Sequence, residues 1–323
     1  MSDKPPVRTI FLCSGRLGIP IIDALRQDSR IQLLGIYSQV DKPVGRKKVI
    51  APTVFTQHCL QQGLSVERVS SVNNPAFLEY LRTLDLDLLI VVSFGQLLKE
   101  EILSLPEFGC LNVHASLLPK YRGASPIASA ILQGETETGV TFMKMDKGLD
   151  TGPIYQAFSL PIGPMENCGQ LEWRLGNLAA AHLPTICWQV CRENLQFQPQ
   201  KPTSAAIVRK ISKTDGAIHW DKSASMIAKM VRAYTPWPKA YSFLPTSRGV
   251  KRIQITQAVA VGGNFGENTI PGQILPMQDV LGVACGSGCL KILRIVPEGR
   301  KEMNSADFLR GNPVTYGTVL SSE

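Results

Sequence analysis

The chain has 323 residues, 44% of them apolar and 19% charged, so it can bury a large core and lacks the bias of disordered or fibrous proteins. Its first eight residues do not resemble a secretory signal, and acidic residues interrupt its most apolar stretch, residues 84–98. Eight cysteines without a C-x-x-C pair are too few for a disulfide scaffold and favour a reducing compartment. We therefore expect a soluble, cytoplasmic protein that does not interact with membranes.

The net charge of +8 is unevenly distributed along the chain. Residues 1–195 contain 18 basic and 18 acidic side chains, whereas residues 196–323 contain 16 and 8. A neutral half followed by a basic half is typical of a catalytic domain joined to a domain that binds a polyanion such as nucleic acid. A basic surface that only keeps the protein in solution explains the charge equally well.

Strand-like and helix-like patterns alternate through the first half of the chain. Thr9–Ser14 and Leu33–Ser38 are β-prone, and Gly18–Arg26 between them has helical spacing, which predicts a βαβ unit. The elements predicted after it are helices at Val54–Gln62 and Asn74–Leu84 and strands at Leu86–Val92, Leu111–His114 and Val140–Met143. This alternation predicts an α/β fold with an N-terminal, doubly wound, Rossmann-like sheet, in which ligands bind at the carboxyl ends of the strands.

The second half of the chain has a different pattern. A long amphipathic helix is predicted at Met165–Asn194, and residues 196–208, with two prolines and little to bury, are predicted to be a linker. A helix and five short strands follow, at Ala224–Arg232, Ala240–Phe243, Arg252–Val261, Gly272–Ile274, Val280–Ala284 and Cys289–Val296. We therefore assign residues 1–195 to a catalytic domain and residues 209–323 to a basic, small β-barrel domain of OB-like type, a fold that often binds oligonucleotides.

The loop after the first predicted strand, Ser14–Gly18, contains two glycines. It lacks the third glycine and the spacing of a dinucleotide-binding fingerprint. We interpret it as a tight strand-to-helix turn and do not expect NAD to bind there.

Polar residues that suit acyl transfer lie in the strand that contains Asn112 and His114. Alternate side chains of a strand share a face, so an amide and an imidazole project together into one cleft. Such a pair can stabilise an oxyanion and receive a proton from an attacking amine, although a hydrogen-bonded structural histidine is an equally good interpretation of this pattern alone. Asp150 lies in a glycine-flanked loop that could bring its carboxylate to the imidazole, and the local sequence alone favours an Asx-turn.

Several separate segments, in the right order and at the right spacing, resemble the signature of the formyltetrahydrofolate-dependent formyltransferases. They are Asn112-Val113-His114, Ser116-Leu117-Leu118-Pro119, Arg122-Gly123, Glu137–Thr141 and Gly148–Gly152. The resemblance implies formyl transfer from 10-formyltetrahydrofolate as a co-substrate, without a metal. It also implies three catalytic roles: Asn112 would donate to the oxyanion, His114 would be a second donor or relay the proton of the amine, and Asp150 would orient the imidazole and stabilise its charged form. Whether His114 or Asp150 takes the amine proton stays open at this point.

The resemblance also implies where the folate binds. Backbone groups of two loops would contact the pterin and apolar side chains would cover it, although core packing is an alternative role for the leucines. The residues implied are Phe94, Gly95, Leu97, Leu98, Ser116, Leu117, Leu118 and Pro119.

Later motifs resemble those of the family members that act on methionyl initiator tRNA. They are residues 215–220, 235–238 and 298–303, and the basic run 39–48 is similar to a loop that those members place against the acceptor end of the tRNA. The tRNA-binding residues implied are Arg46, Lys47, Lys48, Lys210 and Lys213. A solvated basic loop is the alternative for residues 39–48, and we expect the protein to be a monomer.

Other functions stay open at this point. An amino-sugar nucleotide or glycinamide ribonucleotide formyltransferase, or a hydrolase that releases formate, would share the Asn112, His114 and Asp150 pattern, and the basic C-terminal half argues against them. An RNA-binding protein with an inactive catalytic domain would not need these three residues. The sequence also departs from the family in its first loop, Ser14–Gly18, and in a basic loop one glycine shorter than usual.

Overall fold

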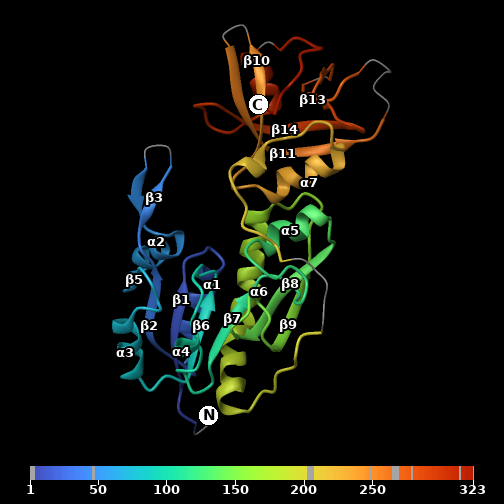
Figure 1. Ribbon diagram of the computed structural model, residues 1–323. Helices are drawn as coiled ribbons and strands as arrows, with labels where there is room; N and C mark the ends of the chain where they lie inside the picture. The colour runs from blue at the N-terminus through green and yellow to red at the C-terminus, as the bar shows by residue number, and fades with distance from the viewer. Residues whose placement is uncertain are drawn as a thin grey trace. The chain divides into compact units, whose positions relative to one another are not determined.

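The computed structural model describes residues 4–45, 48–201, 207–246, 249–263, 269–277, 279–312 and 314–322 (Figure 1). The chain divides into two compact units. The first contains residues 1–126, 137–161 and 172–208, and the second contains residues 127–136, 162–171 and 209–323. Neither unit is one continuous stretch of chain, because two short segments of the N-terminal half belong to the second unit.

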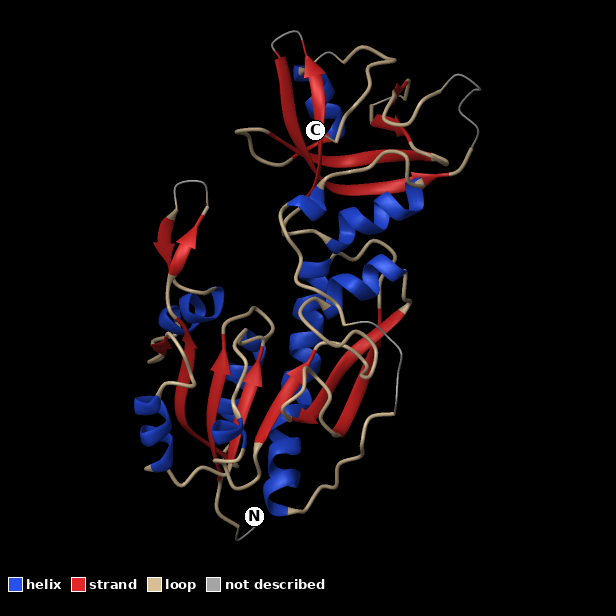
Figure 2. Cartoon of the chain, in the orientation of Figure 1, coloured by secondary structure: helices blue, strands red, loops and turns tan. Residues whose placement is uncertain are grey.

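A seven-stranded sheet forms the centre of the first unit (Figure 2). Its strands are β1 (Val7–Cys13), β2 (Ile31–Gln39), β5 (Glu67–Val69), β6 (Leu88–Val92), β7 (Cys110–His114), β8 (Glu137–Lys144) and β9 (Ile154–Pro161). They are arranged in the order β5-β2-β1-β6-β7-β8-β9, and the first five are parallel. The chain changes direction across the sheet between β1 and β6, where open α/β sheets form a crevice. The predicted doubly wound α/β fold is confirmed.

The described part of the first unit contains all or part of six helices. They are α1 (Gly18–Gln27), α2 (Val54–Gln61), α3 (Pro75–Arg82), α4 (Glu100–Leu103), α5 (Pro126–Gln133) and α6 (Cys168–Arg192), with most of α5 and the start of α6 in the second unit. Local signals explain where two of them begin. The Asn74 side chain accepts from Ala76 N at 2.9 Å, and the Thr53 side chain accepts from Thr56 N at 3.1 Å. Both side chains are N-caps, which fix a helix start by satisfying a free N–H group.

Four strands of the first unit were not predicted: β5, β9 and the two strands of a hairpin. β8 corresponds to the strand predicted at Val140–Met143. β8 and β9 continue the sheet in antiparallel fashion, so the parallel pattern ends at β7. Strands β3 (Lys42–Val44) and β4 (Val49–Ala51) pair as an antiparallel hairpin, which projects beyond α2 (Figure 1). The hairpin and much of β9 are exposed, and exposed strands lack the apolar signal by which buried strands are recognised.

The described parts of the predicted linker, residues 196–208, pair with the first unit. The backbones of Gln198 and Ile154 exchange two hydrogen bonds of 2.8 Å. Val208 N donates to Arg122 O at 2.8 Å, and Ala124 N donates to Val208 O at 2.9 Å. Residues 202–206 of this segment lie outside the described residues.

The second unit contains an antiparallel sheet in the order β10-β11-β14-β13-β12, with β15 added to β14. Its elements are the 3₁₀ turn Thr214–Gly216, α7 (Ala224–Ala233), β10 (Ala240–Thr246), β11 (Gly249–Val261), β12 (Ile274–Leu275), β13 (Leu281–Ala284), β14 (Cys289–Pro297), β15 (Met303–Asn304) and α8 (Ser305–Gly311). Side chains from α7, β11, β14 and α8 form its buried core.

The C-terminal segment joins the two edges of this sheet. Phe243 in β10 exchanges backbone hydrogen bonds of 2.9 and 3.1 Å with Ser321, and Ile274 N at the start of β12 donates to Thr318 O at 2.8 Å. Trp220 Nε1 donates to Ser242 Oγ at 3.0 Å, and this hydroxyl donates to Ser321 O at 2.6 Å. The predicted small barrel is thereby confirmed as an antiparallel, barrel-like sheet. Among the described residues, no helix is long and apolar enough to cross a membrane.

Candidate active site

The structure brings together the three residues predicted to be catalytic. Asn112 and His114 lie in the carboxyl-terminal half of β7, and Asp150 lies in the loop between β8 and β9. Asn112 Nδ2 donates to Asp150 Oδ1 at 3.4 Å, and His114 Nδ1 lies 3.6 Å from Asp150 Oδ2. The carboxylate therefore faces both the amide and the imidazole at the end of one strand.

The tautomer of His114 follows from its surroundings. Its Nε2 lies 2.9 Å from the carbonyl oxygen of Tyr121, and a carbonyl can only accept, so Nε2 carries a hydrogen. Burial lowers the pKa of His114 below its ordinary value, and this effect outweighs the opposing influence of Asp150 and of the Tyr121 hydrogen bond. The ring is therefore neutral at pH 7, and its lone pair is on Nδ1, facing Asp150.

Asp150 has a backbone conformation that few residues other than glycine adopt. Its φ is 54°, in the left-handed region, where aspartate is tolerated better than most side chains. Its Oδ2 also accepts from Gly123 N at 2.8 Å. Gly123 has φ of 110°, and a Cβ there would lie 2.4 Å from Val208 O, so the chain needs glycine at this position. Two loops and a neighbouring segment are thus fitted closely around the carboxylate.

The loop after β7 is held by Thr141 of β8. Thr141 Oγ1 donates to Ser116 O at 2.6 Å and accepts from Leu118 N at 3.1 Å. The Ser116 hydroxyl donates to Lys120 O at 2.6 Å. Ser116 and Leu118 are buried, so within the folate-binding set implied by the sequence these two residues are packed inside the unit.

The other half of that set, residues 94–98, lies in the loop after β6. Gln39 donates to Phe94 O, and Asn73 Nδ2 donates to Leu97 O at 2.8 Å. Phe94 and Leu98 belong to the apolar core, whereas Leu97 is 75% exposed. Leu97 is therefore the apolar side chain of this loop that a ligand could cover.

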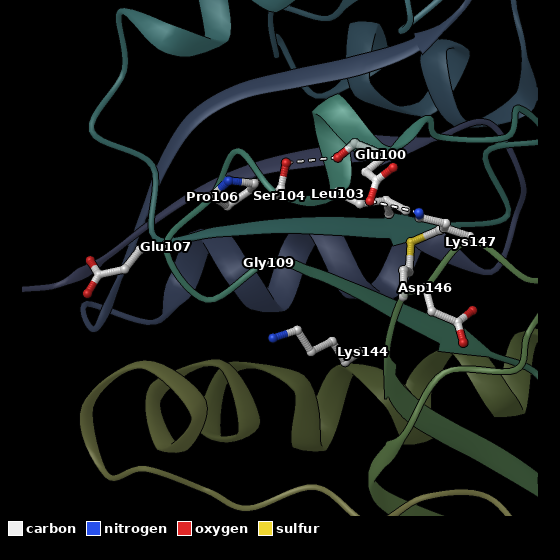
Figure 3. A pocket seen from close by; sticks show the side chains of 10 residues that line it. Glu100, Leu103, Ser104, Pro106, Glu107, Gly109, Lys144, Asp146 and Lys147 are labelled. Carbon is white, nitrogen blue, oxygen red and sulfur yellow. Dashed lines mark hydrogen bonds and ion pairs between the residues drawn. The ribbon is translucent and has the colours of Figure 1, made fainter.

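A pocket of about 390 Å³ lies at the opposite end of β7 from His114 (Figure 3). It is lined by Glu100, Leu103, Ser104, Pro106, Glu107, Gly109, Lys144, Met145, Asp146 and Lys147. Lys147 Nζ forms an ion pair of 2.8 Å with Glu100 Oε1 across its rim. The pocket shares no residue with the implied folate set, but the segment 145–147 leads directly into the loop that carries Asp150.

The residues implied to bind tRNA are only partly described. Lys48, Lys210 and Lys213 are exposed, whereas Arg46 and Lys47 lie outside the described residues. Lys48 directly precedes β4 of the exposed hairpin, and Lys210 and Lys213 precede the 3₁₀ turn of the second unit. Among the described residues, no group of three or more His, Cys, Asp or Glu side chains is arranged to hold a metal ion.

Sequence reasoning did not identify three groups that shape the site. They are the carbonyl of Tyr121, the hydroxyl of Thr141 and the side-chain amide of Gln200. The first is a backbone group and the third lies in the predicted linker, so no local pattern marks either one. Thr141 belongs to a segment that carries the family resemblance, and its position opposite His114 across the β7–β8 pair is the signal that could have revealed it.

Two family models match the chain. Residues 7–187 match the model described as "Formyl transferase", and residues 210–313 match "Formyl transferase, C-terminal domain". The chain is 38% identical to a methionyl-tRNA formyltransferase from Caldanaerobacter subterraneus subsp. tengcongensis, over 97% of this chain and all of that protein.

Solved structures with a similar fold are more distant in sequence. HypX from Aquifex aeolicus in complex with tetrahydrofolic acid has a TM-score of 0.62 and 15% identity, and the match covers 94% of this chain and 46% of HypX. An N-formyltransferase from Helicobacter canadensis, in complex with folinic acid and dTDP-3-aminofucose, has a TM-score of 0.62 and 15% identity over 93% of this chain and all of that one. At this identity the likeness shows a shared fold.

Proposed function

The chain belongs to the methionyl-tRNA formyltransferase family, and from this premise we propose that it transfers the formyl group of 10-formyltetrahydrofolate to the α-amino group of methionine carried by initiator tRNA. The observation that carries the proposal is the meeting of Asn112, His114 and Asp150 at the end of β7, in a chain whose similarity to these enzymes extends over both units. An amide, a neutral imidazole and a carboxylate are the groups that acyl transfer to an amine requires.

The reaction forms one bond and breaks another. The lone pair of the methionine α-amino group attacks the formyl carbon, and the carbonyl π electrons move to the formyl oxygen. The attacking nitrogen then loses a proton, the oxyanion collapses, and the bond between the formyl carbon and N10 of the folate breaks. The electron pair of that bond passes to N10, which takes up a proton and leaves as tetrahydrofolate.

Asn112 is the proposed donor to the oxyanion. One N–H of its amide points to Asp150 Oδ1, and an amide NH₂ group has a second N–H to offer. The contact with Asp150 fixes the orientation of the amide before substrate binds. A preorganised donor of this kind stabilises charge that develops only in the transition state.

His114 is the proposed acceptor of the amine proton, through Nδ1. Its Nε2 hydrogen is committed to the Tyr121 carbonyl, so Nδ1 is the ring nitrogen with a lone pair. The carboxylate of Asp150, 3.6 Å from Nδ1, would stabilise the imidazolium that results. The burial that lowers the pKa of His114 keeps the ring neutral, and therefore able to accept a proton, at pH 7.

The two substrates would bind to different surfaces. Folate is proposed to contact the loops at residues 94–98 and 116–119, where the exposed Leu97 could cover a planar ring. The tRNA is proposed to contact the basic residues of the hairpin segment, Arg46, Lys47 and Lys48, and residues 209–323, including Lys210 and Lys213, through its phosphates. The eight cysteines include no C-x-x-C pair, a pattern that favours a reducing, cytoplasmic location.

The test is a competition among formyl acceptors. Purified protein and labelled 10-formyltetrahydrofolate are mixed with methionyl initiator tRNA, free methionine, an amino-sugar nucleotide or water alone. We expect label to accumulate on methionyl-tRNA, with the other acceptors at background. Label on the sugar nucleotide, or formate released into water at a comparable rate, would replace this proposal by one of the other formyl-group reactions.

A further inference from the structure

The side chain of Gln200 connects the two loops that surround the catalytic carboxylate. Its Nε2 donates to Asp150 O at 2.9 Å and to Gly152 O at 2.8 Å. Its Oε1 accepts from Arg122 Nε at 3.0 Å and from Arg122 Nη2 at 2.6 Å. Both N–H donors and both lone pairs of the amide are used, so the side chain has reached its full hydrogen-bonding capacity.

The orientation of this amide is fixed by its partners. If the oxygen and nitrogen of Gln200 exchanged places, the oxygen would face two carbonyl oxygens and the NH₂ group would face the guanidinium of Arg122. Both contacts would repel, so only the orientation with Nε2 toward the Asp150 loop is possible. Gln200 therefore acts on the Asp150 loop as a donor, and on Arg122 as an acceptor.

The carbonyl bound by Gln200 belongs to the residue whose backbone is strained. Asp150 has a φ of 54°, and this region costs a residue other than glycine about 1–3 kcal/mol, so the conformation persists only where the surroundings hold it. Hydrogen bonds to the carbonyls of Asp150 and Gly152 hold the backbone on both sides of Thr151. On the other side of the carboxylate, Gly123 N follows Arg122 directly and donates to Asp150 Oδ2.

We propose that Gln200 is a positioning residue for the formyl-transfer reaction: by tying the Asp150 backbone to Arg122, it holds the Asp150 carboxylate against Asn112 and His114. This inference rests on the proposed function, because it assigns Gln200 a role in that reaction. It also gives part of the predicted linker a place in the active site, although Gln200 touches no reacting atom.

Replacing Gln200 by glutamate separates positioning from simple anchoring. Q200E keeps the chain length and an even stronger acceptor for Arg122, but it presents carboxylate oxygens to the carbonyls of Asp150 and Gly152. Q200A removes both sets of contacts. If anchoring to Arg122 were the role of Gln200, Q200E would work as well as the wild type. If Gln200 instead positions Asp150, the formylation rate of Q200E should fall about as much as that of Q200A.

The first measurement is steady-state formylation of methionyl initiator tRNA. We expect kcat to fall about 10- to 100-fold in Q200A and Q200E, because displacing a catalytic group by up to about 1 Å has an effect of this size. The KM values for the folate and for methionyl-tRNA should stay within about threefold of the wild type. Q198A, which changes an exposed glutamine two residues earlier, should match the wild type. In the D150N background, Q200A should cost almost nothing further, because the group it positions is already lost.

The second measurement does not depend on activity. The chain has four histidines, so the imidazole of His114 can be assigned and titrated by NMR. Asp150 and the Tyr121 carbonyl, the groups that face the ring, both favour its charged form. Displacement of Asp150 in Q200A, like its neutralisation in D150N, should therefore lower the pKa of His114. Q198A should leave the titration unchanged.

Full activity in Q200E, additive losses in the double variant, or an unchanged His114 titration in Q200A would each overturn the positioning role. If the wild type formylates no methionyl-tRNA, the proposed function fails. The NMR titration still decides in that case whether Gln200 holds Asp150 against His114.

Discussion

Two opposing effects shift the pKa of a buried histidine next to a carboxylate: burial lowers it and the carboxylate raises it. In His114 the effect of burial is the larger one. Its folded-state pKa lies below the value of about 6.5 for an exposed histidine. Below pH 6.5, down to the folded-state pKa, the unfolded chain therefore binds more protons at this site than the folded chain. The contribution of His114 to the free energy of unfolding rises with pH through this window and is level above it.

The pH dependence of stability tests this assignment. We expect the free energy of unfolding of the wild type, measured by urea denaturation between pH 5 and 8, to fall below pH 6.5 more steeply than that of H114Q, which has no titrating ring. H58Q serves as the control, because it removes a partly buried histidine that lies outside the site. Identical pH profiles for the wild type and H114Q would show that burial does not set the protonation state of His114.

Asn112 carries the oxyanion assignment. Replacing it by alanine removes the amide but no core packing, because the side chain is only partly buried. We expect kcat to fall about 100- to 1000-fold, the usual effect of losing one preorganised oxyanion donor, with little change in thermal stability. N177A, at an exposed position in α6, is the control. An N112A enzyme with more than a tenth of the wild-type kcat would remove Asn112 from this role.

Some residues of the candidate site could be predicted from the sequence and others could not. Asn112 and His114 were found because their spacing in a strand places them on one face. The partner of His114 Nε2 is a backbone carbonyl, and Gln200 lies 50 residues after the aspartate that it contacts. Neither contact leaves a local pattern, since each depends on the tertiary fold.

At the level of elements, β8 supports the site through one hydroxyl. Thr141 satisfies the buried carbonyl of Ser116 and the buried N–H of Leu118. T141V keeps the shape of the side chain but leaves both groups without a partner, at about 1–3 kcal/mol each. We expect a loss of about 2–6 kcal/mol in the free energy of unfolding, measured with urea at pH 7. T141S keeps the hydroxyl and should retain most of the wild-type stability. A T141V protein as stable as T141S would contradict this account.

Elements were predicted well where burial or a cap leaves a mark in the sequence. β6 is apolar throughout because it is buried on both faces, and α3 begins with an Asn-Pro pair that caps its first turn. The C-terminal segment around Ser321, which joins the edges of the barrel-like sheet, is too short and too polar to be recognised as a strand. Its role arises from the pairing of β10 and β12 on either side of it.

At the level of the whole molecule, the excess positive charge lies in residues 196–323, almost all of which belong to the second unit. The predicted linker at residues 196–208 would make a cut near residue 200 an obvious test of tRNA binding. The structure argues against this cut, because the second unit also contains residues 127–136 and 162–171, and Gln200 contacts the Asp150 loop. Changes of charge in the full-length chain are the better experiment.

We expect the double variant K210E/K213E to bind tRNA more weakly and with less dependence on salt. Each lost phosphate contact should reduce the slope of log affinity against log salt concentration by about 1. R26E/K99E makes the same change of net charge at exposed positions of the first unit and should leave the slope unchanged. If the slopes of log affinity against log salt concentration are equal in the two double variants, Lys210 and Lys213 do not contact phosphates, and the basic charge of this region serves solubility.

The most direct test of the whole account is a single-turnover measurement of formyl transfer. The wild type or D150N is mixed, in excess, with methionyl initiator tRNA and saturating labelled 10-formyltetrahydrofolate. Samples taken over time are then assayed for label on the α-amino group of methionine. The account predicts rapid transfer by the wild type and a rate at least about 100-fold lower in D150N, with unchanged tRNA affinity, because the carboxylate acts in the chemical step. Equal single-turnover rates in the two proteins would contradict it.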